Sequence, residues 1–489
     1  MNESISMNID ASPAAIAAFV GYLLIIILIG LFSTRFSSKG ITEFFLGGRK
    51  MNRFVVALSA VVSGRSAWLL LGVTGMAYVR GLSALWACVG YIVVELFLFL
   101  FLAPVLRRQT EQLDALTLPD YFEARFGDKS RLLRFVSVFI IFLFMIAYVA
   151  AQFKAGGKAF SSGFGMDETA GLLLTSAIVL FYTVLGGFLA VSITDMVQAF
   201  LMILALLILP IVAILNYGGW VNVAEALAAI NPPHLDPLAL TFGVFIGFVG
   251  IGLGSPGNPH ILVRYMSIDD PVQLKVSALV GTVWNVLMAA GAILIGVVGR
   301  VYYPSPNFFP DKDPEHLFPL LAQTQLHPIL FGLIIAAIFA AIMSTADSQL
   351  LVASSSMVRD IYQKVLRQKQ DVAPRKLVIY SRIFVFLLVI FAIILAFLAA
   401  DWVFWLVLFA WGGLGASFGP TILLSLFWKR TTKWGVLVGL ISGTLVTIIW
   451  KSTPFLSNLI YELVPAFTIS FILTIVTSLV TKSTNVRYN

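Results

Sequence analysis

Apolar runs long enough to cross a lipid bilayer recur along the whole sequence. Hydrophobic residues occupy 59% of the 489 positions and charged residues only 11%. Inside the hydrocarbon layer every backbone polar group must be paired within the protein, and a helix of about 20 apolar residues achieves this. The pattern predicts an all-α polytopic membrane protein with thirteen transmembrane helices, at 13–32, 54–79, 82–104, 132–160, 168–187, 189–214, 238–256, 274–302, 327–352, 377–399, 402–427, 435–451 and 463–481.

Lysine and arginine are distributed unevenly between the two sets of connecting segments. The segments that follow odd-numbered runs carry 25 of the 32 Lys and Arg residues. Because short cytoplasmic loops are enriched in these residues, we expect the N-terminus outside and the C-terminus in the cytoplasm. The formal net charge of +8 follows from this topology, so it does not indicate binding to nucleic acid. Nothing in the sequence indicates an oligomeric state.

The sequence lacks the signatures of common enzyme and metal sites. Its single cysteine, Cys88, excludes a disulfide framework and a cysteine-based metal site. There is no Gly-x-Ser-x-Gly elbow, no His-Glu-x-x-His motif and no phosphate-binding loop, and the four histidines are scattered. We therefore expect a protein that is not an enzyme and that does not use a nucleotide.

The second apolar run is interrupted in its middle by Ser63-Gly64-Arg65-Ser66. Glycine weakens a helix, and a permanent charge near membrane depth is costly and usually functional. The alternatives are that Arg65 extends to a membrane interface or makes a buried structural pair. We favour a functional site, because the charge coincides with a point where the helix is expected to break.

The seventh run, with its continuation to His260, carries a second interruption. Four glycines and two prolines fall within its last eleven residues, at Gly250, Gly252, Gly254, Pro256, Gly257 and Pro259. The two interrupted runs begin two blocks of five spans, which start on opposite sides of the membrane. Interrupted helices at matching positions of two inverted halves indicate a transporter whose binding sites lie between the halves.

A polar face lies in the ninth run, at Ser344, Thr345, Asp347 and Ser348. Ser344, Asp347 and Ser348 share one helix face, and Thr345 lies beside it. Hydroxyls with one carboxylate suit Na⁺, which prefers oxygen ligands, whereas small polar residues also join membrane helices by simple hydrogen bonds. Asp347 fits the second explanation poorly, so we expect a sodium site. Asp195 is interpreted as a second ion ligand or proton acceptor, with an interfacial helix cap as the alternative.

Several short motifs together resemble a known family. They are Leu46-Gly-Gly-Arg49, Ala57-Leu-Ser-Ala60, Trp68-Leu-Leu, Ala115-Leu-Thr-Leu-Pro-Asp-Tyr121, Phe126-x-Asp128-Lys-Ser-Arg131, Gly186-Gly-Phe-Leu-Ala-Val-Ser192, Thr194-Asp195, Pro259-His-Ile-Leu262 and Met343-Ser-Thr345. With these motifs the chain resembles the sodium/solute symporter family, and within it the bacterial sodium/proline symporters. The resemblance covers nearly the whole chain.

The resemblance implies a leucine-transporter-type fold with a 5+5 inverted repeat. We expect an extra helix and a cytoplasmic loop over 1–53, the first half over 54–214, the second half over 215–427, and two extra helices over 428–489. The protein is then expected in the bacterial inner (plasma) membrane.

The resemblance also implies positions for the sites. The main sodium site would use the carbonyls of Val62, Arg65 and Ala341 with the hydroxyls of Ser344 and Thr345, and a second sodium site would use Asp195, Ser344, Asp347 and Ser348. The substrate pocket would be lined by Trp68, Tyr148, Ile251, Ser255 and Pro259.

Three features depart from the proline symporters that the chain resembles. Those proteins carry Asp-Met where this sequence has Gly64-Arg65, and aromatic residues where it has Ile251 and Ser255. Asp347 also replaces a serine of the second sodium site.

Three functional hypotheses follow. The first is sodium-coupled uptake of a small amino acid, best represented by proline, with Arg65 and Ser66 contacting the substrate. The second is a sodium-independent, proton-coupled or exchanging carrier in which Arg65 reaches Asp347 and replaces a sodium ion. The third, from a different class, is a receptor that binds its ligand without transporting it.

Overall fold

Every predicted span forms a helix in the computed structural model, which describes residues 12–37, 41–185, 187–367, 372–399 and 402–482. The helices are α1 Pro13–Ser37, α2 Ile41–Leu46, α3 Arg53–Ala67, α4 Thr74–Arg80, α5 Leu85–Phe97, α6 Ala103–Gln112, α7 Leu118–Phe126, α8 Leu132–Phe164, α9 Glu168–Leu185, α10 Phe188–Asn216, α11 Trp220–Ile230, α12 Phe242–Gly250, α13 Pro259–Ser267, α14 Leu274–Tyr302, α15 Leu317–Gln325, α16 Pro328–Ser355, α17 Pro374–Leu398, α18 Val403–Phe427, α19 Lys433–Ser452, α20 Pro454–Ser457 and α21 Leu463–Val480.

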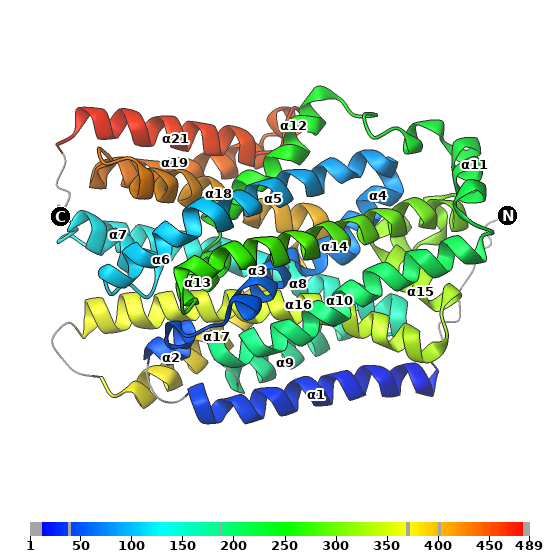
Figure 1. The fold of residues 1–489 in the computed structure, drawn as a ribbon, viewed down its shortest axis with the longest axis horizontal. Helices are drawn as coiled ribbons and strands as arrows, with labels where there is room; N and C mark the ends of the chain where they lie inside the picture. The colour runs from blue at the N-terminus through cyan, green and yellow to red at the C-terminus, as the bar shows by residue number, and fades with distance from the viewer. Residues whose placement is uncertain (1–11, 38–40, 186, 368–371, 400–401, 483–489) are drawn as a thin grey trace.

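Most helices run lengthwise through the molecule, as in a bundle that crosses a membrane (Figure 1). In the described part of the chain, ten segments are long and apolar enough to span a bilayer. One of them, Arg53–Gln112, contains two spans, because the chain reverses at Gly81, where φ is 65°. The shorter α9 and the pair α12–α13 account for the remaining predicted spans.

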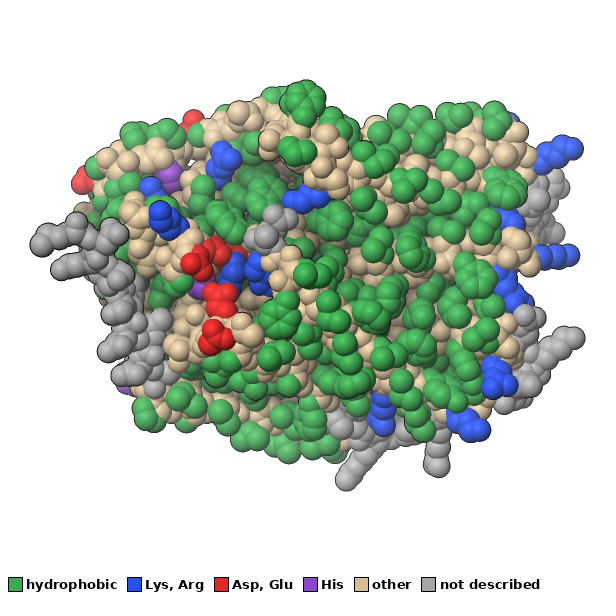
Figure 2. All heavy atoms as spheres, turned by 180° about the vertical axis from the view of Figure 1, so that it is seen from behind, with side chains coloured by type: hydrophobic (Ala, Val, Ile, Leu, Met, Phe, Trp, Pro, Cys, Tyr) green, Lys and Arg blue, Asp and Glu red, His purple; other side chains and the backbone are tan. Residues whose placement is uncertain are grey.

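The surface matches this orientation. Figure 2 shows a broad hydrophobic band across the molecule, with basic side chains gathered at one end and a group of acidic and basic side chains near the other. The basic end carries α2 and α7, and we call it the α2–α7 end. A band of this kind is expected where the surface of a protein faces the hydrocarbon of a bilayer.

Two helices are enclosed by the others. In the most apolar stretches of α16 and α18, 83% and 89% of residues are buried, compared with 28% in α1 and in α21. The core therefore surrounds α16 and α18, whereas α1 and α21 lie at the periphery. This placement explains how α16 carries several polar residues without exposing them to lipid.

The seventh span corrects one prediction. The sequence pattern ends this span at 256 and assigns Arg264 to a basic loop. In the structure the chain unwinds into a 3₁₀ segment over Ile251–Gly257 and resumes as α13. Arg264 lies within α13 and is only 1% exposed, so it belongs to the interior.

Close helix contacts give a test of the packing. A Cβ added at Gly291 of α14 would lie 2.2 Å from the carbonyl oxygen of Leu206 in α10. We expect Gly291→Ala to force these helices apart and to lower the free energy of unfolding by about 1–3 kcal/mol, measured as a lower unfolding temperature in detergent. Gly21→Ala in α1 is the control, because a Cβ there meets nothing within 4 Å. Equal unfolding temperatures for the two variants would contradict this packing.

Candidate substrate and cation site

The first helix break lies at Ser66, between α3 and the segment that begins at Trp68. Ser66 has φ 51° and ψ −172°, which no helical residue adopts. The backbone groups freed by the break are paired within the protein: the N–H of Ala67 donates to Gln152 Oε1 (3.1 Å), and that of Trp68 donates to Ser66 Oγ (3.0 Å). The predicted interruption is therefore present, and it falls at Ser66.

Gly64 allows close packing between helices and is not the site of the break. It lies within α3, and a Cβ there would approach Ile261 Cδ1 of α13 to 3.0 Å. A larger residue at Gly64 would therefore press against the segment that follows the second break.

The second break is also satisfied by side chains. Asn258 Nδ2 donates to the carbonyl of Gly254 (2.8 Å), and Trp411 Nε1 donates to that of Ile251 (2.9 Å). Pro259 begins α13, a position at which its missing N–H is not needed. Both breaks are thus stabilised by polar side chains, one from the break itself and one from another helix in each case.

Arg65 is buried in a polar cluster with α5 and α14. Its guanidinium pairs with Glu95, Nε donates to Asn285 Oδ1 (2.8 Å), and the group lies 3.7 Å from the centre of the Tyr91 ring. Asn285 also donates to Glu95 (2.9 Å). The idea that Arg65 reaches Asp347 is therefore corrected: its carboxylate partner is Glu95, for which the sequence offered no partner.

The expected substrate residues surround the two breaks and are buried. The Trp68 ring lies 5.6 Å from that of Phe404, nearly parallel to it, and Ser255 Oγ donates to Glu95 Oε1 (3.5 Å). The Tyr148 ring lies 5.9 Å from that of His260, the residue after Pro259. Ile251 is 2% exposed and lies at the start of the second break.

The expected residues of the main sodium site come from α3 and α16. Thr345 Oγ1 donates to the carbonyl of Ser63 (3.0 Å), the residue after Val62. Ser344 Oγ donates to the carbonyl of Ala341 (3.2 Å). The Thr345 hydroxyl therefore contacts α3 next to its break, whereas the Ser344 hydroxyl bonds within α16, and all of these residues are buried.

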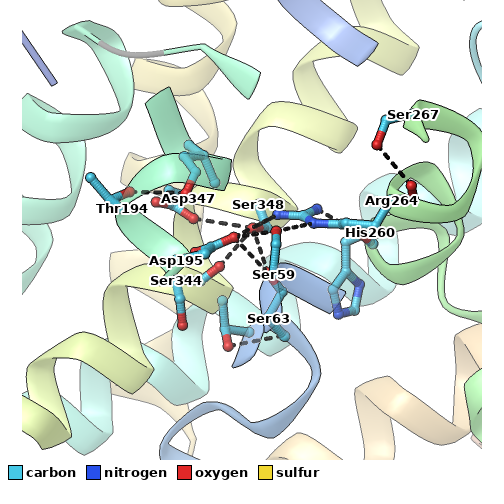
Figure 3. A network of polar contacts seen from close by, with 12 residues as sticks. Ser59, Ser63, Thr194, Asp195, His260, Arg264, Ser267, Ser344, Asp347 and Ser348 are labelled. Atoms are coloured by element: carbon cyan, nitrogen blue, oxygen red, sulfur yellow. Dashed lines mark hydrogen bonds and ion pairs between the residues drawn. The ribbon is translucent and has the colours of Figure 1, made fainter. Parts of the chain in front are cut away.

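A second cluster joins four helices around Asp195 of α10 (Figure 3). Asp195 Oδ2 accepts from Ser59 Oγ (2.6 Å) and Ser63 Oγ (3.3 Å) of α3, and it lies 3.4 Å from Arg264 Nη2. On α16, Ser348 Oγ lies 3.2 Å from Ser63 Oγ. Asp195 is an interior residue of α10, so the interfacial cap is excluded.

Asp347 and Arg264 complete this carboxylate cluster. Ser348 Oγ lies 3.2 Å from Asp347 Oδ1, and Arg264 Nη2 hydrogen-bonds to Ser348 Oγ. The residues expected of a second sodium site thus lie together, beside a buried guanidinium that the sequence analysis assigned to a loop.

The two ends of the site differ. At the end opposite α2 and α7, Lys158 of α8 pairs with Asp313 and Glu315, and Glu315 accepts from the N–H groups of Val403 (2.9 Å) and Phe404 (2.8 Å) of α18. This network ties α8 and α18 together over the breaks.

Toward the α2–α7 end, a pocket leads away from the carboxylate cluster. Arg264 and Ser348 line it at one side, and Phe45 of α2, Thr117 and Leu118 of α7 line it at the other. This pocket is small, about 20 Å³, whereas a larger one of about 320 Å³ adjoins Ile251 of the second break.

Three site residues escaped the sequence analysis. Glu95 showed no partner within reach in the sequence, and Ser59 appeared only as part of a family motif. Arg264 did leave a signal: it lies five residues after Pro259 within the apolar stretch Ile261-Leu-Val-Arg264, which suits a restarted helix better than a loop.

Solved structures share this fold. A Na⁺-coupled sialic acid symporter in a substrate-bound outward-open state matches with a TM-score of 0.82 over 97% of this chain and 99% of that chain, at 22% identity. MhsT in complex with L-phenylalanine matches with a TM-score of 0.57 over 88% of this chain and 98% of that chain, at 12% identity. The predicted leucine-transporter-type fold is confirmed.

Sequence comparison extends the likeness to close relatives. The chain is 39% identical to the osmoregulated proline transporter OpuE of Bacillus subtilis, over 94% of both chains. It is also 39% identical to a sodium/proline symporter of Staphylococcus aureus, over 99% of this chain and 96% of the relative. The family model of the sodium:solute symporters matches residues 44–443. The chain therefore belongs to the sodium:solute symporter family.

Proposed function

We propose that this protein imports a small amino acid, with proline the first candidate, by symport with Na⁺. The observation that carries the proposal is the contact of the Thr345 hydroxyl, next to Ser344 on α16, with the broken helix α3. The names of the relatives, a sodium/proline symporter and a proline transporter, support the choice of ion and solute. The protein acts by transport without chemical conversion of its substrate.

A sodium ion at the main site would join the two helices that must move relative to one another. Its ligands would be the carbonyls of Val62, Arg65 and Ala341 with the hydroxyls of Ser344 and Thr345. At a helix break, carbonyl oxygens can replace the water of a hard cation. A second cation site would be formed by Asp195, Ser344, Asp347 and Ser348.

The substrate would bind beside the first break. Arg65 and the hydroxyl of Ser66 suit its carboxylate, and Trp68 and Tyr148 provide aromatic surfaces for an apolar ring. Ile251, Ser255 and Pro259 would complete the pocket from the second broken helix. Ion and substrate would share α3, so that each raises the affinity for the other.

The protein would be oriented with the basic α2–α7 end in the cytoplasm, with the N-terminus outside and the C-terminus inside, in the bacterial plasma membrane. The pocket at Arg264 and Ser348 would then face the cytoplasm, and the Lys158 network would close the outer side. In an alternating-access cycle, the cytoplasmic opening would then form at this pocket.

Sodium dependence is the first test. In proteoliposomes with a sodium gradient we expect uptake of radiolabelled proline, and its loss when Na⁺ is replaced by choline. Ser344→Ala and Thr345→Val should each raise the half-saturating Na⁺ concentration about tenfold, the effect of roughly 1.4 kcal/mol per lost ligand. Thr447→Val is the control, because its buried hydroxyl bonds only within α19. Equal uptake in Na⁺ and choline would refute the proposal.

The role of Arg65 is tested by changing Arg65 alone and together with its partner Glu95. Arg65→Met leaves Glu95 buried without its cation, which should cost about 3–5 kcal/mol of stability. The double variant Arg65→Met/Glu95→Gln should restore folding, measured by thermal unfolding in detergent, because no buried charge is left unpaired. If Arg65 binds the substrate carboxylate, the double variant still loses proline uptake. If the double variant took up proline at the wild-type rate, the role of Arg65 would be structural only.

A further inference from the structure

The carboxylate cluster contains an unbalanced set of buried charges. Asp195 and Asp347 are fully buried, and Arg264 is 1% exposed, so two carboxylates face one guanidinium. Within the described part of the chain, Asp195 Oδ1 and Asp347 Oδ2 accept no hydrogen bond. Buried carboxylate oxygens without partners are costly, so this cluster is built to receive positive charge.

Arg264 already occupies part of that position. Its Nη2 atom contacts Asp195 and Ser348, two residues expected of the second sodium site, and its Nε donates to Ser59 Oγ (3.1 Å). The remaining terminal nitrogen, Nη1, donates to the carbonyl of His260 on its own helix (2.6 Å). The guanidinium is therefore anchored to α13 while it satisfies oxygen atoms of three other helices.

The location of α13 allows the guanidinium to leave. The 3₁₀ segment Ile251–Gly257 separates α13 from α12, so α13 can move as a unit when the broken helix changes shape. Arg264 also lines the pocket toward the α2–α7 end, which lies on the proposed cytoplasmic side. The guanidinium thus stands between the carboxylates and the route by which an ion would leave.

We propose that Arg264 is a tethered cation that competes with sodium for Asp195 and Ser348. In the inward-facing state the guanidinium occupies the place of an ion and so displaces it toward the cytoplasm; in the outward-facing state α13 withdraws and the site accepts sodium. This inference rests on the proposed function, since it assumes that sodium binds at the site. It differs from a structural ion pair, which would leave sodium binding unchanged.

Binding of ²²Na⁺ to the purified full-length protein in detergent tests the proposal without transport. Arg264→Gln is expected to bind one more sodium ion per chain than the wild type, and Asp195→Asn in the same background should remove that ion. Arg107→Gln is the matched control: Arg107 is another buried arginine, and its Nε donates to the carbonyl of Ile268 just after α13, away from the carboxylates. Equal sodium binding by the wild type and Arg264→Gln would overturn the proposal.

A chemical restoration of the charge covers the case in which Arg264→Gln does not fold. Arg264→Cys is made together with Cys88→Ala, which removes the natural cysteine. A thiol reagent that adds an ammonium group should abolish the additional sodium ion, and a neutral reagent of similar size should not. The same result with both reagents would contradict competition by charge.

The experiments distinguish a failure of sodium-coupled transport from a failure of competition by Arg264. Absence of sodium binding and of sodium-dependent uptake in the wild type would refute the proposed function, and an ion bound only by Arg264→Gln would still support competition at this cluster. Sodium-dependent uptake by the wild type with unchanged binding in Arg264→Gln would refute the competition alone.

Discussion

The structure depends on one constraint: inside a membrane, a helix can be interrupted only where other groups pair its freed backbone atoms. Both interruptions meet this constraint with side chains, some from the break itself and some from other helices. At the first break, Gln152 of α8 accepts from a backbone N–H. At the second, Asn258 and Trp411 donate to backbone carbonyls. Each break is thus paired within its own block of helices, the first by α8 and the second by α18. The same breaks are where we propose that backbone carbonyls contribute to ion binding.

Pairing of buried charges is a second constraint on the arrangement of the helices. Two arginines are buried next to the breaks, and each is paired with a carboxylate on another helix: Arg65 with Glu95 on α5, and Arg264 with Asp195 on α10. A buried charge without a partner is far more costly than a paired one, so each pair restricts which helices can be neighbours.

The sequence was sufficient for features that depend on local pattern. Apolar runs predicted each span, glycines and prolines predicted both interruptions, and the spacing of Ser344, Asp347 and Ser348 predicted a shared polar face on α16. Contacts between residues that lie far apart in the sequence could not be predicted from it. Arg65 and Glu95 are thirty residues apart on different helices, and nothing local distinguishes Glu95 from Asp347 as the partner. Arg264 was misplaced because a restarted helix and a basic loop begin with the same proline and glycine signals.

The main consequence of this arrangement is that α3 links three separate events. Its break exposes the carbonyls proposed to bind sodium, its Arg65 and Ser66 adjoin the proposed substrate pocket, and its Ser59 and Ser63 contact Asp195 in the carboxylate cluster. A displacement of α3 would therefore change all three sets of contacts together. Reciprocal coupling requires that each ligand distinguish between the same two states, and a helix shared by every site meets this requirement without a longer pathway through the protein.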